Sequence, residues 1–199
     1  MQYVRGVSIS SSTTTTTTKT ASASSLKLAV APVEGWADDS AYRQGGNYNN
    51  TQAVYGRTEL IKNTSEQALF NQEVWGKNIN YKIPVQNGNY ILRLHFVELY
   101  HNAPGRRIFN VNVQNALLLQ NFDVFASVNK FSALTKEFPI FVSNGELNIS
   151  LSAISDNATI SGIELIKTDG YQQTVVVEYK DVTGTVVKKY TDTFNHLVS

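Results

Sequence analysis

The feature that most limits the fold is an alternation of apolar and polar residues from residue 80 to residue 167. Successive side chains of a β-strand point to opposite faces of its sheet, so alternation indicates strands with one buried and one exposed face. The runs are rich in β-branched and aromatic residues, which favour strands. They predict strands at Tyr81–Val85, Tyr90–Glu98, Arg107–Val113, Leu117–Phe122, Thr135–Val142, Glu146–Ala153 and Ile160–Lys167.

Turn-forming dipeptides separate several of these runs. Asn87-Gly88 and Asn144-Gly145 are typical of hairpins, and Asp156-Asn157 occupies another turn. Short strands closed by such turns, with no long helical period, predict an all-β fold, namely a β-sandwich or jelly roll of antiparallel strands. One further short strand at 26–30 and one short helix near 65–70 are expected.

The two ends differ in composition from the middle of the chain. Residues 8–25, SISSSTTTTTTKTASASS, have almost nothing to bury, which predicts a disordered Ser/Thr-rich linker over residues 1–25. The sandwich is expected over 26–170. Two strand-like runs within 171–199 flank Asp181–Gly184 and predict a β-hairpin, either docked on the sandwich or opening a further domain.

Composition excludes several classes of partner. The net charge is +1 with mixed signs, so no basic stripe for nucleic acid or anionic lipid is expected. The chain has no cysteine, hence no disulfide or thiolate metal site. No apolar run reaches the ~18 residues that span a bilayer. The first residues lack the apolar core of a signal peptide.

The segment HFVELYHNAPGRRIFNV, residues 95–111, joins two of the predicted strands. By alternation, Glu98 and Arg107 point toward the core at the two mouths of the loop. If the flanking strands pair as a hairpin, Glu98 lies opposite Arg107, so their charges neutralise each other, and Phe96 lies opposite Phe109. This predicts a structural ion pair below a rigid loop that displays Tyr100 and His101.

Few residues point to catalysis. The three histidines are too scattered for a metal motif, and neither a G-x-S-x-G elbow nor a glycine-rich phosphate loop occurs. We therefore assign no catalytic residue, metal or cofactor. One enzymatic alternative stays open, because two of Glu98, Asp123 and Asp156 could form a glycosidase pair if they lie ~5–9.5 Å apart.

Aromatic residues beside loops are the stronger signal. Aromatics in alternating strands are normally buried in the core, whereas Tyr55, Phe70, Trp75, Tyr100 and Phe125 lie in or next to loops. Sugar rings stack on such faces, while carboxylates and amides bind their hydroxyls. The alternative for each residue is packing at the edge of the sandwich.

Several spaced motifs resemble the malectin family of carbohydrate-binding domains. The similarity covers about residues 36–167 and rests on WADDSAYRQGG (36–46), QALFNQEVWG (67–76), NYKIPVQNGNYILRLHFVELY (80–100), APGRRIFNVNV (103–113), LLLQNFDVF (117–125) and DNATISGIEL (156–165). The combination is specific, although each motif alone is weak.

This resemblance implies a lectin-like β-sandwich whose loops bind short oligosaccharides without catalysis. The ligand-binding positions it implies are Tyr55, Phe70, Trp75, Tyr100, His101 and Asp156. The chain departs from the family at LKLAVAPVEG, where an Asn-Ala-Gly-Gly type of sequence is usual. It also departs at Phe70 and His101, where the family has other aromatics.

Three hypotheses follow. The first is a carbohydrate-binding module, for gluco-oligosaccharides or related glycans, of a larger extracellular or cell-surface protein or one of the secretory lumen. The second is a structural or protein-interaction sandwich that has lost sugar binding. The third is a glycosidase that uses Glu98 or Asp156.

Overall fold

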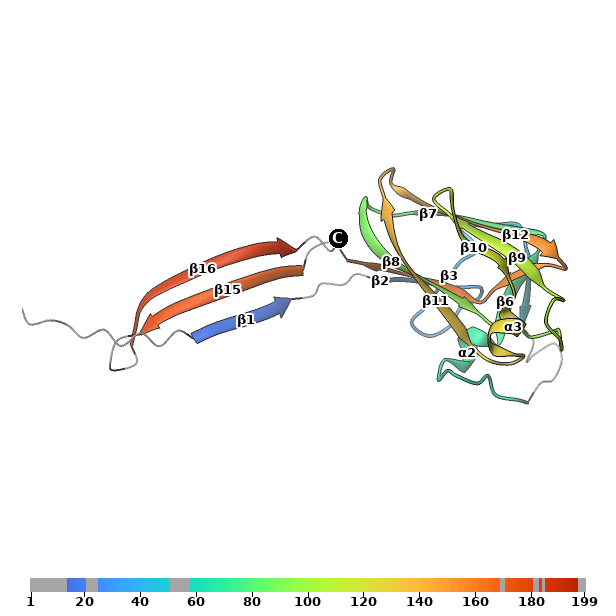
Figure 1. Cartoon of the computed structure of the whole chain (residues 1–199), viewed down its shortest axis with the longest axis horizontal. Coiled ribbons are helices and arrows are strands. Elements are labelled where there is room, and N and C mark those ends of the chain that lie inside the picture. The colour runs from blue at the N-terminus through green and yellow to red at the C-terminus, as the bar shows by residue number, and fades with distance from the viewer. Residues whose placement is uncertain are drawn as a thin grey trace, which may run out of the picture. The chain divides into compact units, whose positions relative to one another are not determined.

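The computed structural model describes residues 14–20, 25–50, 58–168, 171–180, 183 and 185–196. The chain divides into two compact units, one of residues 24–167 and one that combines residues 1–23 with 168–199. Both are built from strands, as the alternation predicts (Figure 1). No helix in the described ranges is both long enough and apolar enough to cross a membrane.

The larger unit is a sandwich of two five-stranded sheets. One sheet has the order β10-β9-β12-β7-β4 and is called the amide sheet below. Its strands are β4 (Arg43–Gln44), β7 (Asn78–Pro84), β9 (Ile108–Val113), β10 (Ala116–Phe122) and β12 (Glu146–Ser155).

The other sheet has the order β11-β8-β14-β2-β3 and is called the ionic sheet below. Its strands are β2 (Ser25–Ala29), β3 (Ala37–Asp38), β8 (Gly88–Phe96), β11 (Leu134–Val142) and β14 (Gly162–Lys167). A smaller three-stranded sheet has the order β13-β6-β5. It contains β5 (Asn47–Asn50), β6 (Gln72–Gly76) and β13 (Ala158–Ile160), and the two short helices are α2 (Gln67–Phe70) and α3 (Val124–Val128).

The core lies between the two large sheets and follows the alternation. In β7, Ile79, Tyr81 and Ile83 are buried while the residues between them are exposed. A second buried cluster covers the outward side of the ionic sheet near the end of β8, where the rings of Trp36 and Phe70 lie edge-on to His95. His95 therefore faces away from Phe96, as alternation requires.

The predicted hairpin across residues 95–111 is wrong. β8 pairs with β11 and β14, and β9 pairs with β10 and β12, so the two strands belong to different sheets. Phe96 and Phe109 still meet, with ring centroids 6.0 Å apart, but across the core instead of along a ladder. Alternation fixes which side chains face inward, and either arrangement brings them together.

A tight turn brings β5 against β6. Asp39 is buried and accepts hydrogen bonds from Tyr81 Oη at 2.7 Å and from Arg43 Nε at 3.0 Å, which holds the turn before Gly46. Gly46 has φ +77°, and a Cβ there would lie 2.4 Å from Val74 Cγ1. Only glycine allows this close approach, which positions β5 beside the loops of the sandwich.

The smaller unit is a three-stranded antiparallel sheet with the order β1-β15-β16. β15 (Tyr171–Lys180) and β16 (Val186–His196) confirm the predicted C-terminal hairpin. β1 (Thr14–Thr20) lies within the tract predicted to be disordered, and it pairs with β15. Threonine is β-branched and suits a strand once a partner strand is available. Apart from Ser25, which begins β2, the rest of that tract lies outside the described residues.

Candidate functional site

A buried ion pair supports the loop that follows β8. Arg107 Nε donates to Glu98 Oε2 at 2.8 Å, and the two side chains are 4% and 1% exposed. Glu98 Oε1 accepts the backbone N–H groups of Tyr100 and His101 at 2.8 and 2.9 Å. Both carboxylate oxygens are thus occupied, as burial of a charge requires. The predicted ion pair is confirmed, although it bridges two sheets.

Asp156 lies beside this pair, in the turn between β12 and β13. Its Oδ2 is 2.9 Å from His101 Nε2 and 3.8 Å from Arg107 Nη1, and Oδ1 accepts from Asn157 Nδ2 at 3.0 Å. Lys77 Nζ donates to its backbone carbonyl. Burial acts to raise the pKa of Asp156, but the hydrogen bond from His101 and the charge of Arg107 outweigh it, so the pKa is lowered. The carboxylate is ionised at neutral pH and still reaches solvent.

Glu73 is a second carboxyl group of this region. It lies in β6, is buried, and accepts a hydrogen bond from Thr159 Oγ1 at 2.7 Å. Burial raises the pKa of Glu73 against the opposing charge of Arg107. The pKa of Glu73 is therefore raised while that of Asp156 is lowered, because Glu73 is buried, whereas Asp156 keeps contact with solvent and is bonded to His101.

These groups line a hollow of about 450 Å³. Short strand β5 and strand β6 form one side, and the loop after β8 and the turn after β12 form the other. Tyr100 at the rim is 63% exposed, and Tyr48 is 47% exposed. The lining residues are Tyr48, Asn49, Glu73, Trp75, Tyr100, Arg107, Asp156 and Asn157.

The hollow brings together three of the predicted ligand-binding residues, Trp75, Tyr100 and Asp156. His101 acts on it through Asp156, and its ring is edge-on to that of Tyr100 with centroids 5.0 Å apart. Phe70 is elsewhere: it is 3% exposed and belongs to the second buried cluster. Tyr55 lies outside the described residues.

Sequence reasoning missed Tyr48, Asn49, Glu73 and Asn157. The short strands β5 and β6 carry no sustained alternation, so the pattern did not place them. The adjacent polar residues Asn71, Gln72 and Glu73 within the otherwise apolar run ALFNQEVWG (68–76) were the available signal. A buried carboxylate in such a run indicates a paired or functional group.

The carboxylates of the glycosidase alternative have structural partners. Asp123 caps α3, since its side chain accepts from Ala126 N at 2.9 Å, and it also accepts from Gly105 N. Glu98 uses both oxygens within the loop. Within the part of the chain that the structure describes, no group of three His, Asp or Glu side chains is arranged to hold a metal ion.

Comparison with known proteins gives one family match. The Malectin domain family profile matches residues 27–178. Malectin-A of Xenopus laevis is 26% identical over 110 residues, which are 54% of this chain and 40% of that protein. A probable receptor-like protein kinase of Arabidopsis thaliana is 32% identical over 119 residues, 54% of this chain and 14% of the kinase. The chain thus matches less than half the length of either relative.

Solved structures share the fold. The ANX2 ectodomain of Arabidopsis thaliana has a TM-score of 0.57 at 18% identity, covering 66% of this chain and 43% of that one. A β-glucuronidase of Bacteroides uniformis has a TM-score of 0.58 at 18% identity, covering 71% of this chain and 18% of that one. At this identity the likeness concerns the fold alone, and it agrees with the predicted all-β sandwich.

Proposed function

The chain belongs to the malectin domain family, a family of carbohydrate-binding domains without catalysis, and we propose that its loop hollow binds a neutral oligosaccharide. The observation that carries this proposal is the gathering of exposed aromatic faces around an ionised carboxylate. Tyr48, Trp75 and Tyr100 line the same hollow as Asp156. Aromatic faces beside an ionised acceptor group suit a flat, hydroxyl-rich ligand.

Each group has a distinct task in the proposed complex. Tyr100 and Tyr48 offer rings at the rim for stacking on the C–H faces of sugar rings. Asp156 accepts hydrogen bonds from sugar hydroxyls, and its charge-assisted bonds are stronger than those of a neutral acceptor. Arg107 and His101 hold that carboxylate in place. Binding is expected to be weak, because an open hollow loses much of its gain to desolvation.

The proposed context is a module of a larger extracellular or cell-surface protein. The chain corresponds to 14% of a receptor-like kinase and resembles a plant receptor ectodomain in fold. These two likenesses support the context, with neighbouring domains as further partners. Residues 171–199 would then be an extension of the module or the start of a further domain.

Titration calorimetry with gluco-oligosaccharides tests the proposal. Tyr100→Ala and Asp156→Asn should each lower the affinity about tenfold, the loss expected for one stacking contact or one charge-assisted hydrogen bond. Phe141→Ala is the control, since Phe141 is similarly exposed, at 59%, but lies in β11 outside the hollow. Binding that survives both substitutions unchanged would overturn the site. Turnover of a chromogenic glycoside, abolished by Asp156→Asn, would overturn the non-catalytic assignment.

A second candidate function is protein interaction through the smaller unit. In its sheet of described strands, β1 and β16 are the edges, and β16 runs over 11 residues. Long edge strands pair readily with strands of other chains. Light scattering that shows a defined oligomer, together with no heat from any sugar of the panel, would favour this candidate.

A further inference from the structure

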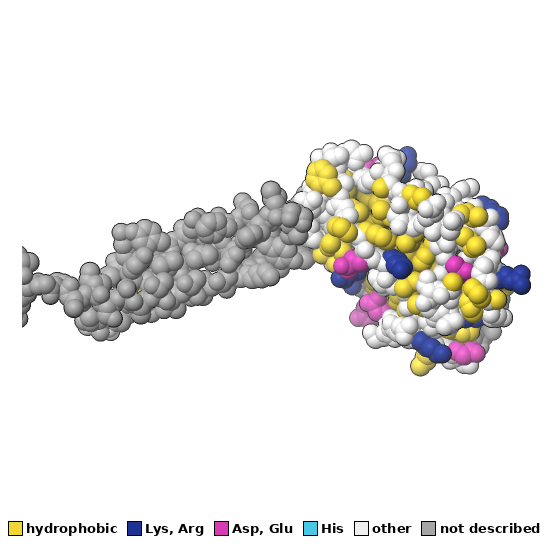
Figure 2. Space-filling model, viewed as in Figure 1, with side chains coloured by type: hydrophobic (Ala, Val, Ile, Leu, Met, Phe, Trp, Pro, Cys, Tyr) yellow, Lys and Arg dark blue, Asp and Glu magenta, His cyan; other side chains and the backbone are white. Residues whose placement is uncertain are grey.

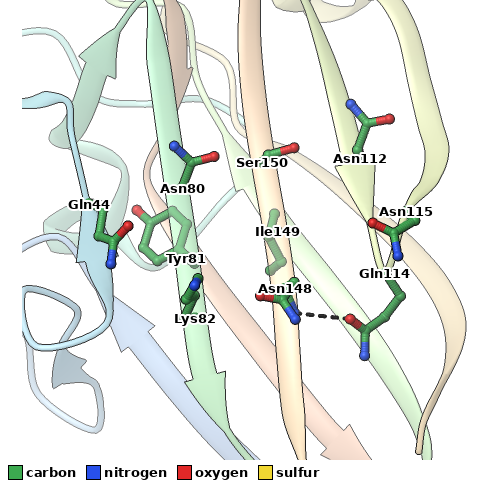
Figure 3. Close-up of a pocket in the computed structure, with 10 residues that line it drawn as sticks. All are labelled: Gln44, Asn80, Tyr81, Lys82, Asn112, Gln114, Asn115, Asn148, Ile149 and Ser150. Atoms are coloured by element: carbon green, nitrogen blue, oxygen red, sulfur yellow. Dashed lines mark hydrogen bonds between the residues drawn. The ribbon is translucent and has the colours of Figure 1, made fainter. Parts of the chain in front are cut away.

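The outward face of the amide sheet carries neutral polar side chains in register. Asn80 pairs with Ser150 and Ser150 with Asn112, so one row of amide and hydroxyl groups crosses β7, β12 and β9. The next row repeats the composition with Asn78, Ser152 and Asn110. In the other direction Lys82 lies opposite Asn148. Figure 3 shows the side chains of Asn80, Lys82, Ser150, Asn148 and Asn112 on neighbouring strands of one face.

This face is hollowed over about 470 Å³. One rim is Gln44 of β4, which pairs with Asn80, and the other is the turn of Gln114 and Asn115 between β9 and β10 (Figure 3). Both turn residues have positive φ, 48° and 67°, which is typical of a tight hairpin turn. The hollow therefore crosses several strands.

The rim is held by internal hydrogen bonds, but the floor is not. Gln114 Oε1 accepts from the backbone N–H of Asn148 at 3.2 Å, and its Nε2 donates to the carbonyl of Glu146 at 2.9 Å. Among the described residues, none forms a hydrogen bond with the side chains of Asn80, Asn112 or Ser150. The Gln114 side of the rim is anchored by these bonds, and the three floor side chains present their donors and acceptors to solvent.

The chemistry of the floor selects a class of ligand. A carboxamide donates and accepts hydrogen bonds at once, as a sugar hydroxyl does, so the two match without ionic attraction. Lys82 is the one charged side chain that lines the hollow, so the charge of this surface does not call for an ionic ligand. Strands lie about 4.8 Å apart, so a chain laid across them meets a polar group on each strand.

We propose that this amide-lined hollow is a second glycan site, separate from the loop hollow, that binds a linear, neutral polysaccharide chain. The two hollows share no lining residue. The amide-lined hollow has no exposed aromatic ring among its lining residues, since Tyr81 is buried and bonded to Asp39. Binding then depends on several modest hydrogen bonds in a row, so it requires a chain of several sugars.

A glycan fits this face better than a peptide. Extended peptides add to sheet edges through their backbone groups, whereas this hollow lies on the flat of the sheet, over side chains. The main chain of β7, β12 and β9 is already paired on both sides. What remains open is the row of side-chain amides and hydroxyls, which matches hydroxyl groups.

NMR titration of the ¹⁵N-labelled chain tests the proposal, carried out in a Tyr100→Ala background so that binding at the loop hollow is weakened. Cellohexaose and xylohexaose are the neutral probes, with cellobiose as the short control and hexagalacturonate as the charged one. We expect shifts in the side-chain NH₂ signals of Asn80, Asn112 and Asn148 with either neutral hexasaccharide, and much weaker effects with cellobiose or hexagalacturonate.

Substitution then distinguishes a site from a general effect. Asn80→Ala with Asn112→Ala removes two hydrogen-bonding groups and should weaken hexasaccharide binding about tenfold. The matched control, Thr58→Ala with Ser143→Ala, removes two exposed polar groups outside both hollows and should leave it unchanged. Equal weakening by both double variants, no shift with either hexasaccharide, or a preference for hexagalacturonate would overturn the proposal. Because Tyr100 is already absent, failure here leaves the loop site untouched.

Discussion

The outward faces of the two sheets of the sandwich differ in how their polar side chains are paired. On the ionic sheet, Lys27, Glu164, Arg93 and Glu137 lie in one row across β2, β14, β8 and β11. Arg93 bonds Glu137 at 2.7 Å and Glu164 at 3.2 Å, and Lys27 lies 3.5 Å from Glu164. On the amide sheet, the two rows through Ser150 and Ser152 are neutral, and Lys82 is the charged residue of the adjacent row.

This difference indicates which face offers a ligand hydrogen-bonding groups that have no partner within the sheet. Charges that alternate along a row pair with one another, so the charged groups of the ionic face already have partners. Near His95 the second buried cluster also covers this face. The floor of the amide hollow offers groups that only solvent or a ligand can satisfy. Lys, Arg, Asp and Glu side chains are otherwise scattered over the visible face of the sandwich, without a large region of one sign (Figure 2).

The largest predicted effect concerns the ion pair of Glu98 and Arg107, which bridges the two sheets. Arg107→Met should reduce the free energy of unfolding by about 3–5 kcal/mol, because Glu98 stays buried without its cation. Urea denaturation measures the loss. Arg106→Met is the matched control, because Arg106 is exposed and should change stability by less than about 0.5 kcal/mol. Equal effects of the two substitutions would show that neither sheet depends on the ion pair.

The next prediction concerns His95, which lies where the second buried cluster covers the ionic face. Burial lowers the pKa of His95 from 6.5 to about 4, in a surrounding that includes Glu164, Arg93 and Lys27, and its Nε2 has no partner among the described residues. Between pH 6.5 and pH 4 the histidine takes up its proton more readily in the unfolded chain than in the folded one. The free energy of unfolding is therefore highest above pH 6.5 and falls as the pH drops toward 4. The loss should approach roughly 3 kcal/mol.

Urea denaturation at pH 7 and pH 4.5 checks this expectation. His95→Phe keeps an aromatic ring against Trp36 and Phe70 but cannot take up a proton. The acid-dependent loss should therefore be smaller in this variant than in the original chain. If both proteins lose the same stability on acidification, the histidine is not the group responsible and its face is better hydrated than the contacts indicate.

A smaller effect is expected from the row of charges itself. Glu164→Gln removes the anion that lies between Arg93 and Lys27 and should cost about 1 kcal/mol, less at high salt. Glu146→Gln on the amide sheet is the control, because Glu146 has no ion pair among the described residues. The change in the free energy of unfolding that this substitution causes should not depend on salt. A salt dependence shared by both variants would contradict the difference between the faces.

The smallest effect on stability is expected on the amide face. Asn80→Ala with Asn112→Ala should change the free energy of unfolding by less than about 0.5 kcal/mol, because these side chains have no internal partner to lose. Thermal unfolding measures this directly. A loss above about 1 kcal/mol would mean that the amides bond within the sheet, which would remove the reason for a ligand there.

Much of the fold followed from alternation alone. Strands β7 to β12, the C-terminal hairpin and the inward direction of Glu98 and Arg107 were all predictable, because a period of two assigns each side chain to a face. The partner of each strand was not predictable. A residue that points to the core meets its opposite whether the strands are neighbours or lie in facing sheets, which is why the hairpin was predicted wrongly.

Some residues of the candidate site were likewise predictable from the sequence, and others were not. Trp75, Tyr100 and Asp156 were identifiable because aromatic and acidic residues beside loops stand out from the strand pattern. Tyr48 and Glu73 were not, since β5 and β6 are short and owe their positions to the turn at Gly46. Phe70 carried the same signal as Trp75, yet it lies in the second buried cluster.

The sequence by itself determined the all-β class, the two faces of each long strand and the need for Glu98 and Arg107 to pair, because these depend on local geometry and on the cost of burying a charge. Only the tertiary structure decided which strands are neighbours, and therefore which polar rows form. Whether a row becomes a chain of ion pairs or an open floor of amides depends on residues far apart in the sequence that long-range pairing places side by side.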